Sequence, residues 1–590
     1  MKTLLSCLVV SMFVLSGLGA VAQTGNHQSE ILRESTTFSS PVIQEQEQYV
    51  TVTLEEQTSC LLKTGTPMLP VVTKVYTFPF GTTIQDVQVT FSNPHQQVIT
   101  KPVMPAPAPR VTSMDTISQQ SLPMTMDTQL YSSDMTYPTT PFSYRAGAGL
   151  DGNNHVIFLS VHFCPVTYTP STKTLTTYDQ ASLTITYNLP PTPKTFSQEY
   201  DLLIIAPSAF SEALQPLVDY KNSQLVSTKL VTLEEIPSVG ADKQEDIKYY
   251  IRDAIENWGI TYVLLVGAGV KNAEVLPVRY TWVPSEGYED SFPSDLYYAD
   301  VYNLLGLFAS WDFDGDGKYG EYIDDILAVD LYPDVNIARL PCNDASEVKS
   351  VVRKIINFEK NNKQSSTILQ IGGDSFVEGD DEQINEGEFA NARVMEVLPG
   401  YQTTQLWGSN EKLTKVNIIL GIYKGVDFVD FNGHGSPISW ATHPPQNENV
   451  WLPTGSKWAG FTYVEVYWLF NFYKLPVIFI NACSTNKFSE SDTCLGYSFI
   501  KKQIGGGIAA FGASGIGYGM VGSSECDRLF GWMEVHTFEN MVTEKIIGDA
   551  WTTSVNDYVS EFIWELWDAD YKTVEELSLF ADPTMAVIPV

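Results

Sequence analysis

The sequence predicts an α/β protein with two parallel-sheet subdomains, preceded by an all-β N-terminal domain. Residues 23–195 are rich in Thr, Val, Ser, Gln and Pro and contain short alternating stretches, which are typical of strands. From residue 196 onward, apolar strand runs alternate with helical patterns, and this order favours parallel sheets. An apolar fraction of 44% in 590 residues is a globular composition with material for several buried cores.

The chain begins with the pattern of an export signal. Lys2 provides a charged start, residues 4–18 are apolar, and Ala20-Val21-Ala22 has the small-x-small form that signal peptidase cuts. We therefore predict cleavage after Ala22, with a retained anchor as the alternative. No later stretch reaches the ~18 apolar residues of a spanning helix. The mature chain is expected to be secreted and to have no membrane span.

Charge and cysteine content narrow the possible partners. The 35 basic and 69 acidic residues give a net charge of -34, which is too negative for a protein that binds nucleic acid through phosphate contacts.

Once Cys7 leaves with the signal, six cysteines remain, and they are scattered over a large chain. This is not the pattern of a disulfide scaffold, so a cysteine can be kept for its reactivity instead.

The N-terminal domain, residues 23–195, is expected to be built of strands such as 49–53 and 182–186. Residues 104–141 lack regular periodicity and predict a long loop over this domain. The proline-rich segment 189–195 predicts a linker, in which Lys194 marks a plausible site of proteolytic cleavage. An uncut hinge is the alternative.

The first α/β subdomain, residues 196–366, begins with a strand over 201–205. Apolar residues then recur at helical spacing from 247 to 258, and Gly259 ends the helix. A second strand over 262–266 completes a β-α-β unit, which predicts a parallel sheet.

The second subdomain, residues 367–590, repeats this order after a helix over 348–358. Its expected strands are residues 367–371, 426–431, 477–480 and 507–511. We expect each half to have its own sheet, and one continuous large sheet is the alternative.

Reactive residues follow three of these strands, namely Asp374, His434 and Cys483. Ligands bind beyond the carboxyl ends of parallel strands, so His434 and Cys483 are predicted neighbours. A thiolate is a strong nucleophile, and a nearby imidazole can lower the thiol pKa and later protonate a leaving amine. The amides of Gly435 and Cys483 could donate to a developing oxyanion. The pattern therefore predicts acyl transfer through a Cys-His dyad.

Each of these residues also has an ordinary structural explanation. Cys483 could be a small buried residue and His434 a histidine in a glycine turn, but their joint occurrence at two strand ends favours catalysis. A serine hydrolase is one alternative. Ser514 lies in Gly-Ala-Ser-Gly-Ile, which departs from the Gly-x-Ser-x-Gly elbow, and Ser514 is more simply a wall of a substrate pocket. A catalytically inactive adhesion or binding protein is the other alternative.

An acidic motif in the first subdomain predicts a structural calcium site. Residues 312–317 have the Asp-x-Asp-x-Asp-Gly spacing that wraps carboxylates around Ca²⁺. Position 12 of the motif is Ile323, so Glu321 or Asp324 would have to complete the shell. The candidate metal residues are Asp312, Asp314, Asp316, Lys318 and Glu321. A solvated turn is the alternative.

Two motifs resemble those of the gingipain family of cysteine peptidases, relatives of the caspases. Apolar strands are followed by Asn-Gly-His-Gly-Ser at 432–436 and by Asn-Ala-Cys-Ser at 481–484. Trp440, His443 and the segment Leu-Phe-Ala-Asp-Pro-Thr-Met at 579–585 extend the likeness, which covers about residues 200–590. The resemblance implies a caspase-like α/β fold in a secreted endopeptidase made as a zymogen. The β domain then stands in the place of the propeptide, as an intramolecular inhibitor, and proteins or peptides are the substrates.

The resemblance also implies roles for individual residues. Cys483 would be the nucleophile and His434 the general acid/base, with Asp374 as the candidate that orients the histidine. Family members select Arg or Lys before the scissile bond through a carboxylate in the specificity pocket. Asp381 and Glu382 lie in the matching stretch, although a solvated acidic loop is the alternative. A preference for basic residues would make Lys194 suitable for self-processing.

Overall fold

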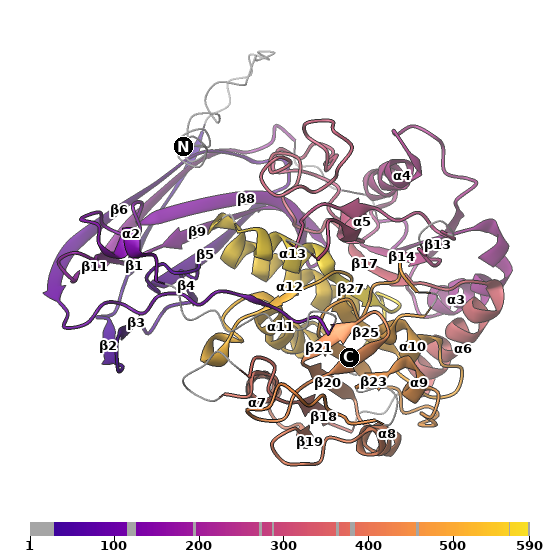
Figure 1. The fold of residues 1–590 in the computed structure, drawn as a ribbon. Helices are drawn as coiled ribbons and strands as arrows, with labels where there is room; N and C mark the ends of the chain where they lie inside the picture. The colour runs from indigo at the N-terminus through magenta and orange to yellow at the C-terminus, as the bar shows by residue number, and fades with distance from the viewer. Residues whose placement is uncertain are drawn as a thin grey trace.

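The structure, a computed structural model, combines an N-terminal β domain with a larger α/β region (Figure 1). It describes residues 29–114, 126–192, 196, 198–270, 274–285, 288–361, 365–377, 384–455, 460–491, 493–565 and 567–587. The expected export signal and Lys194 lie outside the described residues. Among those described, no helix is long and apolar enough to cross a membrane.

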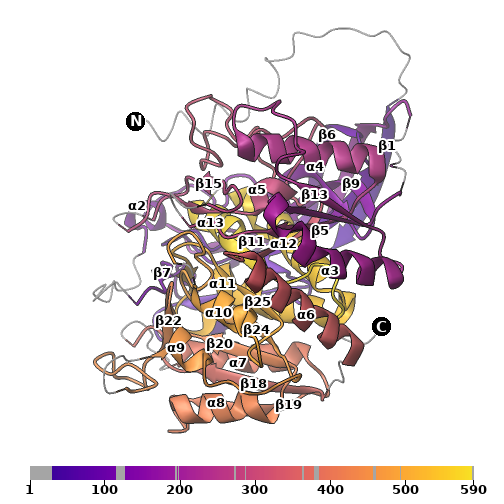
Figure 2. The ribbon, with the colours of Figure 1, turned by 90° about the vertical axis from the view of Figure 1, so that its right-hand side faces the viewer.

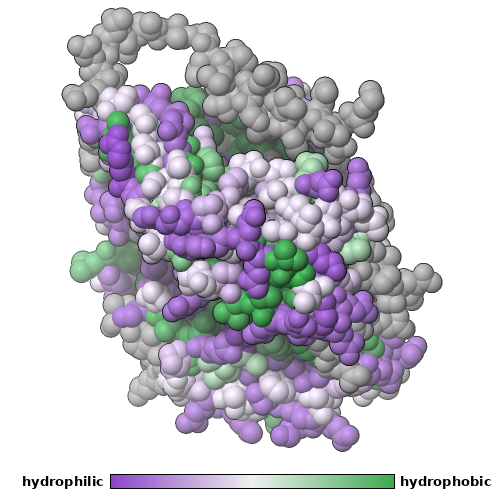
Figure 3. Space-filling view, turned by 90° about the vertical axis from the view of Figure 1, so that its left-hand side faces the viewer, coloured by the Kyte–Doolittle hydropathy of each residue, from purple (hydrophilic) through white to green (hydrophobic). Residues whose placement is uncertain are grey.

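The β domain contains two four-stranded antiparallel sheets and a hairpin. One sheet is formed by β1 (Glu30–Thr37), β6 (Thr83–Val98), β10 (Val166–Thr169) and β11 (Thr174–Asn188), and the other by β4 (Ser59–Cys60), β5 (Pro70–Pro79), β8 (Phe142–Asp151) and β9 (Asn154–Phe163). The hairpin pairs β2 (Val42–Glu45) with β3 (Val50–Thr53). In β11, Leu183 and Ile185 are buried while Ser182 is exposed, which is the alternation that predicted this strand. Figure 3 shows the side of the molecule that carries this domain, with a compact hydrophobic patch near the middle of a largely polar surface.

The segment predicted as a loop over the β domain in fact reaches the α/β region. It contains only β7 (Arg110–Val111) and α2 (Thr128–Tyr131) as regular elements among its described residues. β7 pairs antiparallel with β26 (Tyr518–Gly519), about 400 residues further along the chain. A two-residue strand has too little pattern to be found from the sequence.

The first α/β subdomain has a four-stranded sheet in the order β13-β12-β14-β17, and all neighbours are parallel. The strands are β12 (Leu202–Ala206), β13 (Thr228–Thr232), β14 (Tyr262–Val266) and β17 (Asn336–Leu340), and the main helices are α3 (Ser211–Ser223), α4 (Lys243–Trp258) and α6 (Ala345–Asn361). Gly259 ends α4 in the left-handed conformation, with φ of 67°, and its N–H donates to the Ile255 carbonyl. The predicted β-α-β unit is therefore confirmed.

The second subdomain has its own six-stranded sheet in the order β19-β18-β20-β24-β25-β27. Its strands are β18 (Thr367–Gly372), β19 (Gln402–Trp407), β20 (Phe428–Asn432), β24 (Val477–Asn481), β25 (Ala509–Ala513) and β27 (Leu577–Phe580), of which β27 alone is antiparallel to its neighbour. Helices α7 (Glu386–Val397), α8 (Lys415–Lys424), α9 (Tyr463–Val466), α10 (Leu495–Lys501) and α11 (Leu529–Glu544) belong to this part. The two halves of the α/β region thus each have their own large sheet, as predicted, and do not share one continuous sheet.

Short elements complete the described chain. They are η1 (Ser208–Phe210), β15 (Tyr280–Thr281), β16 (Phe292–Pro293), α5 (Leu296–Ala299), β21 (His434–Ser436), β22 (Ser439–Ala441), β23 (Phe461–Thr462), η2 (Gly522–Ser524) and η3 (Ile563–Glu565).

Two helices near the C-terminus join the domains, α12 (Ile547–Phe562) and α13 (Asp568–Glu576). In Figure 1 they lie between the strands of the β domain and the parallel sheets, and Figure 2 shows the same arrangement from the side. α12 contacts β8 and β9 on one side and β17 on the other. On α12, Glu561 accepts hydrogen bonds from the hydroxyls of Thr58 at 2.7 Å, Thr73 at 2.9 Å and Ser59. Apolar residues of both domains also belong to one continuous core, so the β domain is firmly attached.

Candidate active site

The two predicted reactive loops leave adjacent parallel strands. β20 and β24 pair in register with Asn432 opposite Asn481, and His434 and Cys483 each follow two residues later. Both asparagine side chains donate to the Glu534 carboxyl group on α11, at 2.5 and 2.8 Å. Burial and the neighbouring Asp430 raise the pKa of Glu534 well above its usual value. Glu534 therefore ties together the two strand ends from which the reactive loops emerge.

The loops themselves are in contact, as predicted. A Cβ on Gly435 would lie 2.2 Å from the Cys483 carbonyl oxygen, so this position cannot accommodate a side chain. The glycine beside His434 therefore allows the backbone of that loop to lie directly against Cys483.

A segment of the β domain, residues 110–114, occupies the space between these loops, and we call it the strap. The Thr112 carbonyl accepts hydrogen bonds from the amides of Gly435 at 2.9 Å and Cys483 at 3.4 Å. The Thr112 N–H donates to the Gly517 carbonyl at 3.2 Å, and the Met114 N–H donates to the Gly435 carbonyl at 2.9 Å. Together with the pairing of β7 and β26, these bonds hold the strap as an extended peptide.

The strap lies against the Cys483 sulfur. Thr112 Oγ1 lies 3.2 Å from Cys483 Sγ, and both amides that were predicted as oxyanion donors converge on the Thr112 carbonyl. In an acyl transfer, the carbonyl between two such donors is the one that is attacked. The Thr112–Ser113 peptide bond is thus the one presented to the sulfur.

The Cys483 thiol is fully buried beneath this strap. It donates to the Gly517 carbonyl at 3.2 Å, and burial raises its pKa above the usual value. A thiol in this state is neutral near pH 7 and is a poor nucleophile. The arrangement with the strap in place is therefore a closed one.

His434 lies among aromatic rings and is 7% exposed. Its ring centroid is 5.9 Å from Phe376, 5.6 Å from His443 and 5.3 Å from Trp451. Burial lowers the pKa of His434 to about 4, so the ring is neutral in this state. Trp451 follows no strand and stands in no motif, so the sequence provided no signal for it.

The hydrogen bond that orients His434 is made to Ser375, the residue after Asp374, which was the predicted partner. Its Nε2 lies 2.7 Å from the Ser375 carbonyl oxygen. Asp374, the expected orienting acid, accepts instead from the Gln446 N–H at 2.9 Å, and its backbone pairs with His443. The backbone after β18 therefore reaches the histidine, whereas the Asp374 carboxylate braces a neighbouring loop.

The carboxylates expected in the specificity pocket, Asp381 and Glu382, lie outside the described residues. Several glutamates are buried near the site, namely Glu289, Glu386, Glu525 and Glu576, and none was predicted. Glu386 accepts from the amides of Ser375, Phe376 and Gly522 at 3.1–3.2 Å, and burial raises its pKa to about 7. Its bonds hold the turn after β18 against the turn after β26.

Glu525 is buried beside Gly519. A Cβ on Gly519 would be 3.2 Å from Glu525 Oε2 and 3.2 Å from the Phe376 ring, so the glycine lets the backbone pack closely over both. Glu525 is 5% exposed, and its Oε2 has no hydrogen-bond partner among the described residues. Burial and the nearby Glu386 raise its pKa well above the usual value. A buried carboxyl group of this kind is stabilised in its charged form by a cationic partner.

Ser514, expected as a pocket wall, is fully buried, and its hydroxyl donates to the carbonyls of Pro293 at 2.5 Å and Glu576 at 3.2 Å. The hydroxyl thus connects the end of β25 to neighbouring backbone, and the role as a pocket wall stays a prediction.

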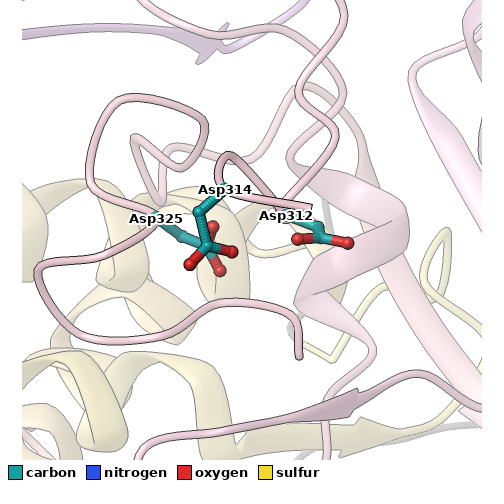
Figure 4. A group of neighbouring side chains, drawn as sticks. All are labelled: Asp312, Asp314 and Asp325. Carbon is teal, nitrogen blue, oxygen red and sulfur yellow. The ribbon is translucent and has the colours of Figure 1, made fainter. Parts of the chain in front are cut away.

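In the predicted calcium loop, several carboxylates lie close together, and one of them, Asp325, was not predicted. Ligand oxygens of Asp312, Asp314 and the buried Asp325 lie within 4.8 Å of one another, as do those of Asp314, Asp316 and Glu321. Figure 4 shows the first group, whose side chains come from two parts of the same loop region. Lys318 Nζ lies 3.0 Å from Asp316 and 2.9 Å from Glu321, so these two acids are already paired.

The chemistry of the first group fits Ca²⁺. Asp325 is fully buried, its pKa is raised to about 6 by burial, and its oxygens accept from the amides of Phe313 and Glu321. Three carboxylates this close repel one another unless a proton or a cation lies between them. Asp325 lies two residues beyond position 12 of the motif, which is why the spacing did not predict it.

The fold and the site define a class of protein: an α/β protein with two parallel-sheet subdomains, whose own N-terminal domain places an extended segment against the loops that follow β20 and β24. The chain belongs to peptidase family C25, because the model of that family matches residues 195–588. The C25 propeptide model matches residues 33–212, which confirms that the β domain is a propeptide.

Known relatives are similar over part of their length. Gingipain R1 of Porphyromonas gingivalis is 25% identical over 388 residues, which is 59% of this chain and 33% of the relative. Gingipain R2 of the same organism is 24% identical over 390 residues, or 59% of this chain and 45% of the relative. The chain thus spans less than half the length of these two relatives.

Solved structures of the family are similar at lower identity. The complex of the Porphyromonas gingivalis RgpB pro- and mature domains has a TM-score of 0.47 at 19% identity, covering 66% of this chain and 81% of that one. The Arg-specific gingipain R (RgpB) has a TM-score of 0.46 at 18% identity, covering 67% and 80%.

Proposed function

We propose that this protein is an exported cysteine endopeptidase, made as a latent zymogen in which the β domain is the inhibitor. The observation that supports this most directly is the Thr112 carbonyl, which accepts from the Gly435 and Cys483 amides beside the Cys483 sulfur. A peptide substrate bound in place of the strap would have its own carbonyl at this point. The proposed substrates are therefore proteins or peptides in extended conformation.

Catalysis would begin when the strap leaves. The Cys483 thiol gives its proton to His434, and Sγ attacks the substrate carbonyl carbon. The negative oxygen that forms is stabilised by the two amide donors. The intermediate then expels the amine, which takes the proton from His434 and leaves a thioester on Cys483. A water molecule hydrolyses this thioester, which releases the acid and restores the thiol.

The geometry around His434 supports its role in this sequence. Its Nε2–H donates to the Ser375 carbonyl, which leaves Nδ1 for proton exchange. In the closed form, Nδ1 is buried and has no hydrogen-bond partner among the described residues. This nitrogen would take the thiol proton and later give it to the leaving amine.

We also propose that Glu525 gives a preference for Arg or Lys before the scissile bond. The support is its buried Oε2, which has no hydrogen-bond partner among the described residues and lies close to Gly519, in the strand that binds the strap. A basic side chain that reached this carboxyl group would form a charge-assisted hydrogen bond with it. In the closed form Thr112, which is short and uncharged, is the strap residue next to Cys483.

A structural Ca²⁺ is part of the proposal. Asp312, Asp314 and Asp325 would hold it, and the ion would neutralise their mutual repulsion. Its place in the first subdomain supports a role in folding stability and not in the chemical step.

The test compares the full-length chain with chain freed of its β domain, using peptides that end in Arg, Lys or Ala before a chromogenic leaving group. We expect cleavage after basic residues only in the freed form, with loss on iodoacetamide treatment or in Cys483→Ala. A chain that binds these peptides but cleaves none would overturn the peptidase assignment. Cleavage that survives iodoacetamide would indicate a serine hydrolase.

A single variant, tested on basic and neutral peptides, examines the pocket separately. Glu525→Gln keeps the size of the side chain but removes its charge, and we expect it to lower kcat/KM for Arg and Lys peptides by about tenfold or more. Activity on a peptide with a neutral residue should stay unchanged. An unaltered preference for basic residues would exclude Glu525 and leave the dyad assignment intact.

A further inference from the structure

The edge of the second sheet opposite the reactive loops carries an exposed aromatic segment. Residues 467–473 precede β24, and five of these seven residues are exposed aromatics, namely Tyr467 at 57%, Trp468 at 66%, Phe470 at 45%, Phe472 at 57% and Tyr473 at 68%. Soluble proteins rarely expose several large rings together unless the surface binds something. We call this segment the aromatic loop.

The aromatic loop is held rigidly in this exposed position. The buried Asn471 side chain donates to the carbonyls of Lys474 at 2.5 Å and Gly506 at 2.8 Å, and accepts from the Gly506 N–H at 2.8 Å. Leu469 is buried in the core beneath it. Phe472 has a φ of 50°, a conformation that a bulky residue adopts only when its surroundings impose it. The rings are thus presented by a fixed backbone.

Lysines surround the loop in a chain that is otherwise strongly acidic. Lys474 Nζ donates to the Lys424 carbonyl, and Lys502 Nζ donates to the Tyr467 carbonyl and lies 4.5 Å from the Phe470 ring centroid. Residues 420–426, 467–474 and 501–506 contain four lysines and no acid, although the whole chain carries a net charge of -34. Of these lysines, Lys501 is paired with Glu347 at 2.7 Å. The acids that flank these stretches are also engaged: Glu465 pairs with Lys415 at 2.9 Å, and Asp427 accepts from the amides of Ser365 and Thr367.

The topology places this basic aromatic surface away from the site. Residues 424–427, 467–476 and 502–508 lead into the amino ends of β20, β24 and β25, which run parallel. His434 and Cys483 follow the carboxyl ends of the same sheet. α8 and α9 lie at the lower end of the molecule in both Figure 1 and Figure 2. A partner at the amino edge would leave the cleft open.

We propose that this amino-edge surface, made of residues 467–474 with Lys424 and Lys502, binds the surface of a bilayer that contains anionic lipids. Tyr and Trp rings favour the region between head groups and acyl chains, and lysines beside them are attracted to anionic head groups. The local positive charge within an acidic molecule orients this edge toward a negative surface. The cleft then faces the solution. The inference does not depend on the proposed peptidase activity.

The test is flotation of the full-length chain with vesicles of phosphatidylcholine, with or without added phosphatidylglycerol. We expect binding to the anionic vesicles, weak binding to pure phosphatidylcholine, and loss of binding in high salt. Trp468→Ser/Tyr473→Ser should weaken binding through lost ring insertion. Lys424→Glu/Lys474→Glu should weaken it by about tenfold or more through charge reversal.

Matched controls separate this surface from general effects. Leu225→Asn removes an apolar residue that is 90% exposed elsewhere, and Lys349→Glu reverses an exposed charge on α6. Both should bind vesicles as the unaltered chain does. Equal binding by the aromatic-loop variants, or no binding by the unaltered chain, would overturn the proposal. A dimer in sedimentation that these variants abolish, without vesicle binding, would assign the surface to a second copy and also overturn it.

Discussion

Thr112 is the residue on which latency depends most directly. Its carbonyl already accepts from both amide donors, and its side chain touches the sulfur. The residue at this position of the strap, Thr112, has no cationic side chain, whereas Arg110, two residues earlier, pairs with Gly519. A single residue thus separates a bound inhibitor from a bound substrate in the proposed mechanism.

We predict that Thr112→Arg converts the strap into a substrate. The full-length chain should then cut itself between residues 112 and 113, because the long cationic side chain binds the pocket while the backbone stays in place. Mass spectrometry should find a new N-terminus at Ser113. Thr112→Val should remain whole, and adding Cys483→Ala should stop the cut. An intact Thr112→Arg chain would contradict the basic preference.

His162, on β9, is a second residue with a measurable consequence at the interface between the domains. Its Nε2–H donates to the Ser560 carbonyl at 2.6 Å, and the ring stacks on Trp564. Burial lowers the pKa of His162 to about 3 in the folded protein, whereas its pKa in the unfolded chain is about 6.5. The neutral ring therefore contributes fully to folding stability above pH 6.5. This contribution is lost as the pH falls from 6.5 toward 3, because the unfolded chain then binds a proton that the folded protein does not.

We predict that His162 makes the full-length chain less stable at pH 5 than at pH 7 by about 2 kcal/mol. Denaturant unfolding of the unaltered chain and of His162→Gln at both pH values isolates this contribution. Glutamine can donate to the same carbonyl but does not titrate, so the variant should show a smaller loss on acidification. The same loss in both proteins would assign the pH dependence to other groups.

Residues of the site differ in how far the sequence could predict them. His434, Cys483 and Gly435 follow apolar strands in recognisable motifs, and chain direction alone brings them to one edge. Glu525 and Glu386 could not be found this way, because a buried acid has the same sequence signal as a solvated one. Asp374 was predicted to orient His434, but the hydrogen bond is made by the backbone carbonyl of the next residue, Ser375. Every residue type has this carbonyl, so the sequence cannot indicate which one is used.

At the scale of elements, the strands predicted in the α/β region were confirmed because they are short apolar runs buried on both faces. β12, β20, β24 and β25 are buried throughout, as expected for parallel strands covered by helices. β7 was missed because its two residues take their partners from β26 rather than from nearby chain. The strap is thus fixed by tertiary contacts, which periodicity cannot reveal.

The acidic loop between β16 and β17 gives a prediction at this scale. We expect Ca²⁺ to raise the Tm of the full-length chain by about 2–4 °C relative to chelator, since an ion held by Asp312, Asp314 and Asp325 binds only the folded state. Asp325→Asn should abolish the shift because it removes the buried charge. Asp324→Asn, beside it, should keep most of the shift. A Tm that is insensitive to Ca²⁺ in the unaltered chain would exclude the site.

At the scale of the whole molecule, the β domain is attached by much more than the linker. Asn556 donates to the Leu150 carbonyl, the Ala148 N–H donates to Asp330, and Glu561 accepts from three hydroxyls of the β domain. These bonds surround an apolar core that both domains share. Cutting the chain between the domains removes none of them. Latency should therefore depend on dissociation of the β domain and not on the cut itself.

We predict that a cut between residues 190 and 196 leaves the protein inactive and in one piece. The test replaces this segment with the recognition site of a specific protease, cuts it, and measures size-exclusion elution and peptide cleavage. Both fragments should elute together without activity, and mild denaturant or acid should then release the β domain and start cleavage. Thr58→Ala/Thr73→Ala removes two bonds to Glu561 and should speed this release. Full activity immediately after the cut would contradict the prediction, because it would mean that the linker holds the strap in place.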